Sequence, residues 1–503
     1  MGGNTNLDSL WWRTYAVPRR PELPGSLAAD VAVVGGGMTG LTAAVLLARA
    51  GLRVVVLEAE RLGAGTSGGT SAHVTQVLDH RYHDLVSTFG REGARQVAAS
   101  TRAALERIAA FVREGRIECD FARVPGWLYT ESDDDVAAIE EELAAAREAG
   151  VAVERDDRTG LPFRVAAAVR FDAQARFHPT RYLAGLARLA EQAGARIFER
   201  SRVRDVQGGA PCRIETDRGT VAAGAVLLAT HTPTAGINLL QFAVEPTRSY
   251  VLALRLRGGA RPPDGLFWDT EDPYHYTRLQ PGPRGGWLVV GGADHKTGHQ
   301  RDTEDCYHDV EDYARERWPV AAVEHRWSSQ FYEPADGLPF IGPSPIAPNV
   351  YVATGFSGTG LVLATLAAMV LCDELQGRRG PWADVYASRR LTLAGGPGFL
   401  AQNLDTAYHF VGDRLGVPRL DDLDRIAPGE ARVVDWRGHT VAAHREESGK
   451  LHTVSAVCTH LFCLVGWNAA EKTWDCPCHG GRFRPDGTVI EGPPSADLAP
   501  IDV

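Results

Sequence analysis

The chain has few of the features that mark secreted or membrane-embedded proteins. Only 3 of its 503 residues are methionine and 8 are cysteine. No stretch reaches the roughly 20 unbroken apolar residues of a membrane span. Residues 1–21 hold no apolar run of signal-peptide length, although Arg19 and Arg20 form a basic pair. We therefore expect a cytoplasmic protein without a membrane span.

The chain also lacks an excess of positive charge. Its 53 lysine and arginine residues are outnumbered by 63 aspartate and glutamate residues, which gives a formal net charge of −10. Nucleic acids and anionic membranes attract basic surfaces, so neither is an expected partner. No internal repeat or low-complexity tract occurs. A length of 503 residues exceeds one compact core, so we expect two or three domains.

The first predicted unit is a strand, a helix and a second strand. Residues 30–34, Asp-Val-Ala-Val-Val, form an apolar run typical of a buried parallel strand. A glycine-rich turn leads into an alanine- and leucine-rich helix over 41–50, and a second apolar strand over 53–57 ends at Glu58. This order is a βαβ unit.

The turn of this unit carries Gly35, Gly37 and Gly40, the spacing of a dinucleotide-binding loop. Gly35 permits the tight turn, Gly37 lets a pyrophosphate approach the backbone, and Gly40 allows close packing of helix on strand. The helix N-terminus then faces the phosphates with its partial positive charge, and Glu58 would bind the ribose hydroxyls.

The rest of the chain changes pattern several times. Residues 84–150 are mostly helical, and another helix is predicted from 179 to 194. Alternating strands between 245 and 327 indicate an antiparallel sheet, and residues 350–375 return to strand, turn and helix. Residues 376–420 are expected to form a connector with a helix around 400–415. From 421 onward short strands and turns predict an independent all-β module.

Several spaced motifs resemble the D-amino-acid oxidase-like family of FAD-dependent oxidoreductases, which includes glycine and sarcosine oxidases. They lie, in chain order, at 58–67, 178–183, 336–342 and 353–360. The resemblance covers about the first 375 residues. It implies an α/β Rossmann-type FAD-binding domain with an inserted α+β substrate domain built on an antiparallel sheet. The FAD-binding segments would be about 28–80, 178–235 and 336–375, and the substrate domain about 84–177 and 236–335.

The resemblance also assigns residues to FAD. Arg61, Thr66 and Ser67 should lie near the pyrophosphate or the flavin, and Val203 should meet the adenine through its backbone. Residues 358–360 should place amide groups near the flavin pyrimidine end, where negative charge develops on reduction. The full expected set is Gly35, Gly37, Met38, Thr39, Gly40, Glu58, Ala59, Arg61, Thr66, Ser67, Val203, Gly355, Gly358, Thr359 and Gly360.

Four of the eight cysteines crowd into residues 458–478, which indicates a metal site or a disulfide. Cys458-Thr-His460 and Cys476-Pro-Cys-His479 supply two thiolates and two imidazoles, the ligand set of a Rieske [2Fe–2S] cluster. Tetrahedral zinc also accepts two cysteines and two histidines. The flanking residues over 458–463, 476–480 and 492–494 resemble the Rieske family across about the last eighty residues, which favours the cluster.

The Rieske resemblance has two further implications. Cys463 and Cys478 fall where respiratory Rieske proteins place a disulfide that clamps the two cluster loops, although free thiols are usual in the cytoplasm. Those proteins also have a serine and a tyrosine whose hydroxyls donate hydrogen bonds toward sulfur. Gly481 and Phe483 stand at these positions. With fewer donors, we expect a potential well below the upper limit of the Rieske range, about −150 to +300 mV.

Together the two resemblances predict an electron relay. A small amine or amino acid would give a hydride to FAD, and the imine left behind would hydrolyse. The cluster would then pass electrons singly to an external acceptor, a protein or a quinone-like molecule. The expected substrate pocket lies in the middle sheet, with Tyr250, Tyr274, Tyr276, Arg278 and His295 as candidates. Arg278 would pair with a substrate carboxylate or, equally, be an exposed arginine at a strand edge.

The sequence leaves several further roles open. Some relatives attach the flavin covalently through a histidine. His73 lies a few residues beyond the position that they use, so an ordinary packed histidine is expected. A Rieske oxygenase would need mononuclear iron at Asp294, His295 and His299 or at Asp79, His80 and His83, and neither spacing resembles that pattern. The chain could also be a flavin reductase or monooxygenase fed by the cluster, or a redox carrier or sensor without turnover.

Overall fold

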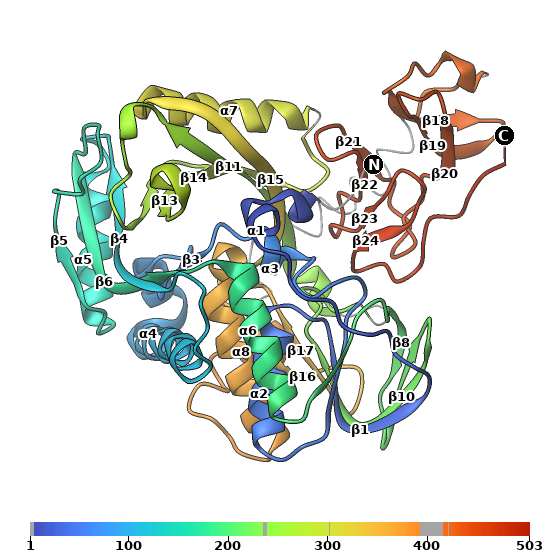
Figure 1. Ribbon diagram of the computed structural model, residues 1–503, viewed down its shortest axis with the longest axis horizontal. Coiled ribbons are helices and arrows are strands. Elements are labelled where there is room, and N and C mark those ends of the chain that lie inside the picture. The colour runs from blue at the N-terminus through green and yellow to red at the C-terminus, as the bar shows by residue number, and fades with distance from the viewer. Residues whose placement is uncertain (1–4, 235–238, 301, 393–415, 421, 503) are drawn as a thin grey trace.

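The computed structural model describes residues 5–234, 239–300, 302–392, 416–420 and 422–502 (Figure 1). The helix expected around 400–415 lies outside these residues. The described chain forms two large sheets with helices packed on them and a smaller all-β module at the C-terminal end.

The first sheet contains the predicted βαβ unit. Its eight strands include a path in the order β16-β17-β10-β1-β2-β7, to which the β8–β9 hairpin is added beside β10. β1, β2, β7, β10 and β17 pair in parallel, as expected for buried strands linked by helices. The strands are β1 (Leu27–Val34), β2 (Val54–Leu57), β7 (Arg196–Phe198), β8 (Val203–Gln207), β9 (Cys212–Thr216), β10 (Gly219–Leu228), β16 (Phe340–Pro343) and β17 (Val350–Thr354).

The second sheet is largely antiparallel. Its nine strands include a path in the order β15-β11-β14-β13-β12-β4-β6-β3, with β5 paired to β6. The pairs are antiparallel except β12–β4, which is parallel. The strands are β3 (His73–Val74), β4 (Ala122–Thr130), β5 (Val153–Arg155), β6 (Ala167–Arg176), β11 (Val244–Leu256), β12 (Leu266–Asp269), β13 (Tyr276–Gln280), β14 (Trp287–Lys296) and β15 (Val320–Pro334).

Helices cover both sheets. In Figure 1, α2, α6 and α8 lie together beside the first sheet, and α7 lies along the second. The α-helices are α1 (Leu10–Thr14), α2 (Met38–Arg49), α3 (Thr66–Gly69), α4 (Tyr82–Glu114), α5 (Val136–Glu148), α6 (Pro179–Gln192), α7 (Thr303–Arg317) and α8 (Gly360–Leu375). The 3₁₀ helices are η1 (Thr5–Asp8), η2 (Leu239–Phe242), η3 (Arg257–Gly259), η4 (Pro283–Gly285), η5 (Ser357–Thr359), η6 (Ser388–Thr392) and η7 (Leu423–Arg425).

One apolar segment has the length of a membrane span. Among the described residues, 357–375 has a mean hydropathy of 1.6, but 67% of this window is buried within the fold. The helix α8 packs against α2 and α4. Helices that are apolar on every side occur in the cores of large domains as well as in membranes, so its packing explains its composition.

The C-terminal module consists of two small antiparallel sheets. β18 (Ala431–Trp436), β19 (His439–Arg445) and β20 (Leu451–Ser455) form one, and β21 (Gly466–Asn468), β22 (Thr473–Asp475), β23 (Arg482–Phe483) and β24 (Val489–Glu491) form the other. In Figure 1 the second of these lies nearer to the rest of the molecule. The α/β domain, the inserted antiparallel sheet and the all-β module together are the predicted fold class.

The C-terminal module is joined to the second sheet by one buried ion pair, Arg248 with Glu471, which belongs to a larger buried charge network. Arg248 of β11 lies 2.8 Å from Glu471, and Arg482 lies 3.0 Å from Glu471 and 3.2 Å from Asp475. All four side chains are at most 2% exposed. Ser328 of β15 also donates a hydrogen bond to Glu471. Because these charges are withdrawn from water, the contact depends on both partners being present.

Candidate cofactor sites

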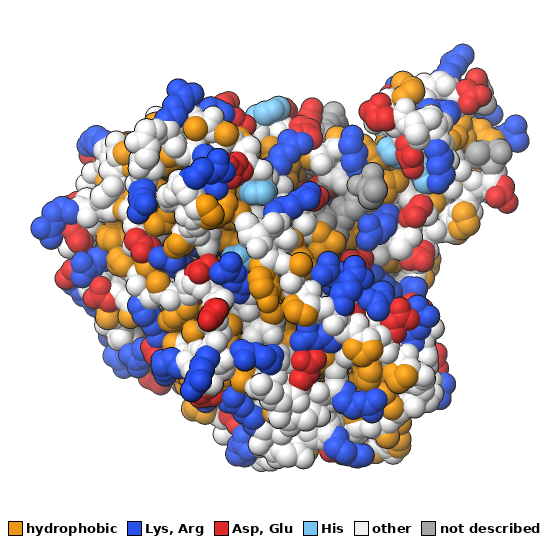
Figure 2. Space-filling model, in the orientation of Figure 1, with side chains coloured by type: hydrophobic (Ala, Val, Ile, Leu, Met, Phe, Trp, Pro, Cys, Tyr) orange, Lys and Arg blue, Asp and Glu red, His pale blue; other side chains and the backbone are white. Residues whose placement is uncertain are grey.

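A cavity of about 590 Å³ begins at the carboxyl ends of β1 and β2 and continues to the second sheet. Its wall is built from both sheets and from the C-terminal module. The module contributes Ile490, Glu491, Gly492, Pro494 and Ser495. In Figure 2 the module lies against the body of the protein, on the right of the view. The cavity therefore belongs to three parts of the chain at once.

The glycine-rich turn has the close approaches that its motif predicts. A Cβ at Gly35, where φ is 107°, would lie 2.4 Å from the carbonyl oxygen of Ala229. A Cβ at Gly37 would lie 2.9 Å from Ser67 Oγ, and one at Gly40 would lie 2.0 Å from the carbonyl oxygen of Gly35. The turn thus keeps backbone at the cavity wall, where a pyrophosphate would meet N–H groups at the start of α2.

Glu58 holds the position expected of a ribose ligand at the end of β2. Its carboxylate accepts hydrogen bonds from the N–H groups of Gly36, at 2.7 Å, and Glu60, at 2.8 Å. Burial raises the pKa of Glu58. These two backbone donors fix the carboxylate at the cavity wall, so the residues present fit the adenosine half of FAD.

Most of the expected FAD residues line the cavity, and three do not. Those in the lining are Gly35, Gly37, Met38, Thr39, Glu58, Ala59, Thr66, Ser67, Val203, Gly358, Thr359 and Gly360. Gly40 packs α2 on the strand instead. Arg61 lies 4.6 Å from the ring centroid of Trp12 and donates to the carbonyl of Val17. Gly355, with φ of 79°, makes the turn after β17.

The far end of the cavity is the candidate substrate site. Tyr274 and Tyr276 line it, and the Tyr276 hydroxyl shares a 2.8 Å hydrogen bond with Ser249. Asp79 faces the same space, where it accepts hydrogen bonds from the Gly358 N–H and, at 3.5 Å, from the Tyr274 hydroxyl. Burial outweighs these hydrogen bonds and raises the pKa of Asp79 to about 6.

Three of the substrate-pocket candidates do not line this cavity. Tyr250, Arg278 and His295 lie outside the cavity lining. The ring of Tyr250 packs on α7, with its centroid 4.9 Å from that of Tyr307. It points away from the cavity because its neighbours Ser249 and Val251 occupy the cavity face of β11, and successive residues of a strand point to opposite faces.

Arg278 is fully buried and does not reach the cavity. It donates to the carbonyls of Ser71 and Leu279 and to the side chain of Gln280. Its guanidinium also lies 5.0 Å from the ring centroid of Trp11. With these donors engaged inside the fold, it is neither a strand-edge arginine nor a partner for a substrate carboxylate.

His73 lines the cavity as a neutral histidine. Its Nδ1 lies 3.1 Å from Ser71 Oγ, and its ring lies 5.4 Å from Tyr276. Burial and the charge of Arg278 lower its pKa to about 3. This is the environment of a packed histidine.

The four expected cluster ligands lie on two loops and approach one another in pairs, thiol to thiol and imidazole to imidazole. The thiols of Cys458 and Cys476 share a hydrogen bond, which lowers the pKa of Cys476. The rings of His460 and His479 lie 5.1 Å apart. Burial lowers their pKa values to about 4 and about 3, so both imidazoles are neutral and have a nitrogen lone pair for a metal. Two thiols and two neutral imidazoles fit a Rieske cluster.

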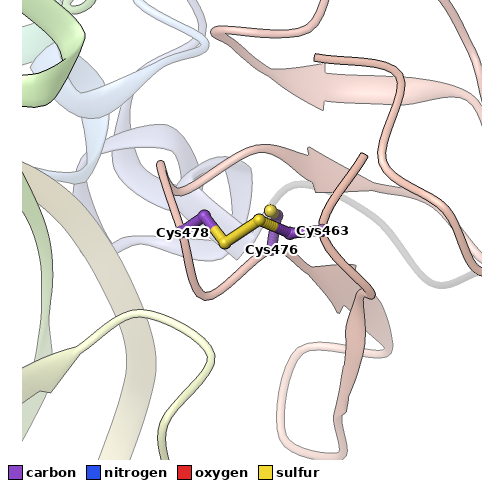
Figure 3. A group of neighbouring side chains, drawn as sticks. All are labelled: Cys463, Cys476 and Cys478. Atoms are coloured by element: carbon purple, nitrogen blue, oxygen red, sulfur yellow. A yellow bond between two sulfur atoms is a disulfide. The ribbon is translucent and has the colours of Figure 1, made fainter. Parts of the chain in front are cut away.

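A disulfide joins the two cluster loops. Cys463 and Cys478 are bonded, with Cα atoms 6.5 Å apart, which confirms the pairing implied by the Rieske resemblance. Figure 3 shows Cys476 beside this bond, and the three sulfurs lie within 4.8 Å of one another. Neither the four candidate cluster ligands nor the two Asp/His trios of an oxygenase iron form so tight a group among the described residues. A Rieske cluster divides its ligands between two irons, so its four ligands need not converge on one point.

Both candidate cluster histidines face the oxidoreductase part of the chain rather than open solvent. His460 Nε2 donates a 2.9 Å hydrogen bond to Gln241 Oε1, and the ring of His479 lies 5.2 Å from Phe242. Both partners belong to η2. This engages Nε2 of His460 and leaves Nδ1 for iron.

Several residues of the cavity wall carry no sequence signal. His231, Gln330 and Tyr332 line the cavity, as do residues 490–495 except Pro493. Apart from Gly492 and Pro494, which belong to the Rieske-like segment 492–494, they belong to no recognised motif, and their placement depends on how distant strands pack. The sequence suggests Asp79 only as an iron ligand, and its position beside Gly358 follows from the fold.

Comparisons with known proteins agree with this geometry. Residues 30–374 match the model of the family "FAD dependent oxidoreductase", and residues 417–502 match that of the "Rieske [2Fe-2S] domain". The putative Rieske 2Fe-2S iron-sulfur protein YhfW of Bacillus subtilis is 33% identical over 99% of this chain and 98% of its own length.

A second relative and a solved structure match the first part of the chain. The gamma-glutamylputrescine oxidoreductase of Escherichia coli is 26% identical over 78% of this chain and 94% of its own length. The crystal structure of glycine oxidase from Geobacillus kaustophilus shares the fold, with a TM-score of 0.60 and 19% identity over 72% of this chain and 99% of that one. The chain therefore belongs to the FAD-dependent oxidoreductase family and carries a Rieske [2Fe–2S] domain after its flavin domain.

Proposed function

We propose that the protein is an FAD-dependent dehydrogenase of a small amine, and that its electrons leave singly through the Rieske cluster to an external acceptor. The observation that carries this proposal is the shared wall, because one cavity is lined by the FAD motif, by Tyr332 and by residues 490–492, 494 and 495. Bound FAD would supply hydride acceptance and one-electron release, and the cluster would supply one-electron transfer.

The charge of the substrate site favours an amine over an amino acid. Arg278 is unavailable to a carboxylate, and acidic side chains outnumber basic ones in this part of the lining. The acids are Asp79, Glu142, Asp269, Glu271 and Asp272, and the base is Arg81. A protonated amine is attracted to such a wall. The printed names of the relatives, an oxidoreductase of gamma-glutamylputrescine and a glycine oxidase, support a C–N substrate.

Asp79 has a defined task in this scheme. A hydride leaves only from a neutral amine, so the ammonium form must first lose a proton. Asp79 is the acidic side chain beside Gly358, with a pKa of about 6, and an oxygen of its carboxylate would take that proton above this pH. Tyr274 orients the carboxylate through its hydroxyl.

The acceptor would be a one-electron carrier, a protein or a quinone-like molecule, and the protein would act in the cytoplasm. An acidic protein with a net charge of −10 suits a carrier with a basic surface.

The test is anaerobic mixing of the purified holoenzyme with a panel of amines and amino acids, followed by flavin absorbance and the Rieske EPR signal. We expect an amine without a carboxylate to bleach the flavin first and the cluster signal to follow. Bleaching by amino acids alone would contradict the amine assignment. A flavin that no compound reduces, beside a readily reducible cluster, would instead favour electron delivery toward the flavin or a sensing role.

A further inference from the structure

Strand β15 contacts both the FAD cavity and the Rieske domain. Successive residues of a strand point to opposite faces. On one face of β15, Trp327 donates to the carbonyl of Gly69 in α3, and Ser329 lines the FAD cavity. On the other face Ser328, Gln330 and Tyr332 all form hydrogen bonds to the Rieske domain.

Tyr332 touches both sites. Its side chain is 2% exposed and lines the cavity. Its hydroxyl donates to the carbonyl oxygen of the cluster ligand His479, at 3.2 Å, with the carbonyl of Gly492 at 3.3 Å. The same hydroxyl accepts a hydrogen bond from Gln330 Nε2, which also donates to the carbonyl of Gly480. Two side chains of one strand thus hold the backbone of the second cluster loop.

On the cavity side, His231 and Thr66 contact Tyr332 and Gln330. The ring of His231 meets that of Tyr332 edge-on, with centroids 4.8 Å apart. Thr66 Oγ1 lies 3.2 Å from His231 Nδ1 and donates to the carbonyl of Gln330. Thr66 is one of the residues expected beside the flavin or its pyrophosphate. Burial lowers the pKa of His231 to about 4, so no charge is added between the sites near neutral pH.

We propose that β15 is the route for electrons between the two sites and that Tyr332 is its positioning residue, holding the cluster loop at His479 against the wall of the FAD cavity. This inference rests on the electron relay of the proposed function, and it identifies the part of the protein through which electrons pass from the FAD site to the cluster. Electron tunnelling weakens steeply with distance and with gaps in packing. A ring packed on one site and hydrogen-bonded to the other therefore shortens the path through space.

The transfer moves electrons and no heavy atoms. One electron leaves the two-electron-reduced flavin and enters the oxidised cluster, which passes from the diferric to the mixed-valence state. The external one-electron acceptor reoxidises the cluster, and a second identical transfer follows. After both transfers the flavin is oxidised and the proton bound to its reduced form has passed to solvent.

The experiment is anaerobic flash photoreduction of the holoenzyme with 5-deazaflavin, which needs no substrate. Flavin and cluster absorbance report the exchange rate, and redox titration and EPR report the potentials and g-values. Tyr332→Phe keeps the ring and removes the hydroxyl, and Tyr332→Leu removes both. Tyr386→Phe is the matched control, because it removes a buried hydroxyl bonded to Ser100 that lies outside the cavity lining.

We expect Tyr332→Phe to slow the exchange about fivefold, the effect of one neutral hydrogen bond on the docked position of the loop. Tyr332→Leu should slow it further, and Tyr386→Phe should leave it unchanged. Potentials and g-values should stay at wild-type values. A Tyr332→Leu protein with both cofactors and a wild-type rate would overturn the inference. If that variant does not fold, an unchanged rate in Tyr332→Phe overturns it equally.

Two further outcomes separate this inference from the proposed function. A slower rate that is fully accounted for by altered potentials would overturn the positioning role. Exchange in the wild type after a flash, with no amine able to reduce the flavin, would refute the proposed substrate and leave the route intact. A wild type that shows no exchange after the flash would overturn both the relay and the route.

Discussion

At the scale of single residues, Asp79 gives the substrate site its pH dependence. Its pKa of about 6 lies above the ordinary value because it is buried, so it is neutral below that pH and charged above it. We expect kcat/KM for an amine to rise with pH through about 6. Asp79→Asn should remove this step and lower kcat/KM about tenfold or more, the effect of one hydrogen bond to a charged group.

The measurement is a pH profile of flavin reduction under anaerobic conditions. Asp133→Asn is the control, since Asp133 is an exposed acid paired with Arg164. A profile with the same step near pH 6 in Asp79→Asn would assign the step to another group.

A second prediction at this scale concerns the effect of Phe483 on the cluster potential. It is fully buried in the same cluster of side chains as Cys458 and Cys476. Phe483→Tyr would restore a hydroxyl where respiratory Rieske proteins have one. One added hydrogen bond, worth about 1 kcal/mol, should raise the cluster potential by about 40 mV. Phe198→Tyr, in the core of the first sheet, is the control, and an unchanged or lower potential in a titration would contradict the prediction.

Gly481 explains why the other hydroxyl is missing. A Cβ there would lie 2.8 Å from the ring of Pro494 and 3.6 Å from Cys458 Sγ. A serine at this position therefore requires Pro494 to move, and Pro494 belongs to the cavity wall. The lower number of donors to sulfur is tied to the docking of this loop on the flavin domain.

At the scale of elements, the two cluster loops depend on their disulfide. The bonded residues Cys463 and Cys478 have a sequence separation of 15. Closing a loop of this length reduces the entropy of the unfolded chain and so raises its free energy by about 3 kcal/mol. We expect the double change Cys463→Ser with Cys478→Ser to lower the midpoint of cluster loss on heating, followed by visible absorbance. Cys306→Ser, a cysteine outside the loops, is the control. An unchanged midpoint would show that packing alone holds the loops.

Some features of the site could be predicted from the sequence and others could not. The glycine turn, Glu58 and the Cys-x-His and Cys-x-x-His motifs are local patterns, so their roles follow from spacing. The charge of Arg278 suggests a pocket residue because the sequence does not show its neighbours, and its buried partners come from segments distant in sequence. The sequence of β15 does not predict which of its faces contacts the FAD cavity and which contacts the Rieske domain. That depends on which part of the molecule packs on each side.

At the scale of the whole molecule, docking of the Rieske domain depends on a buried charge network. Glu471 pairs with both Arg248 and Arg482. Glu471→Gln would leave two buried arginines with less compensation and should destabilise the docked state by about 3–5 kcal/mol. Glu304→Gln, which affects the more exposed pair with Arg326, is the control. Limited proteolysis and thermal unfolding measure the change, and resistance equal to wild type would contradict it.

The shared wall has a consequence for how the protein is made. Residues 490–492, 494 and 495 are synthesised after every other part of the FAD cavity, yet they line it. A nascent chain can therefore fold its nucleotide-binding sheet on the ribosome but cannot close the chamber around a flavin. Closure of the cavity waits for this segment, which follows the cluster loops in the chain. We therefore expect a defect in cluster supply to weaken retention of the flavin in the cell.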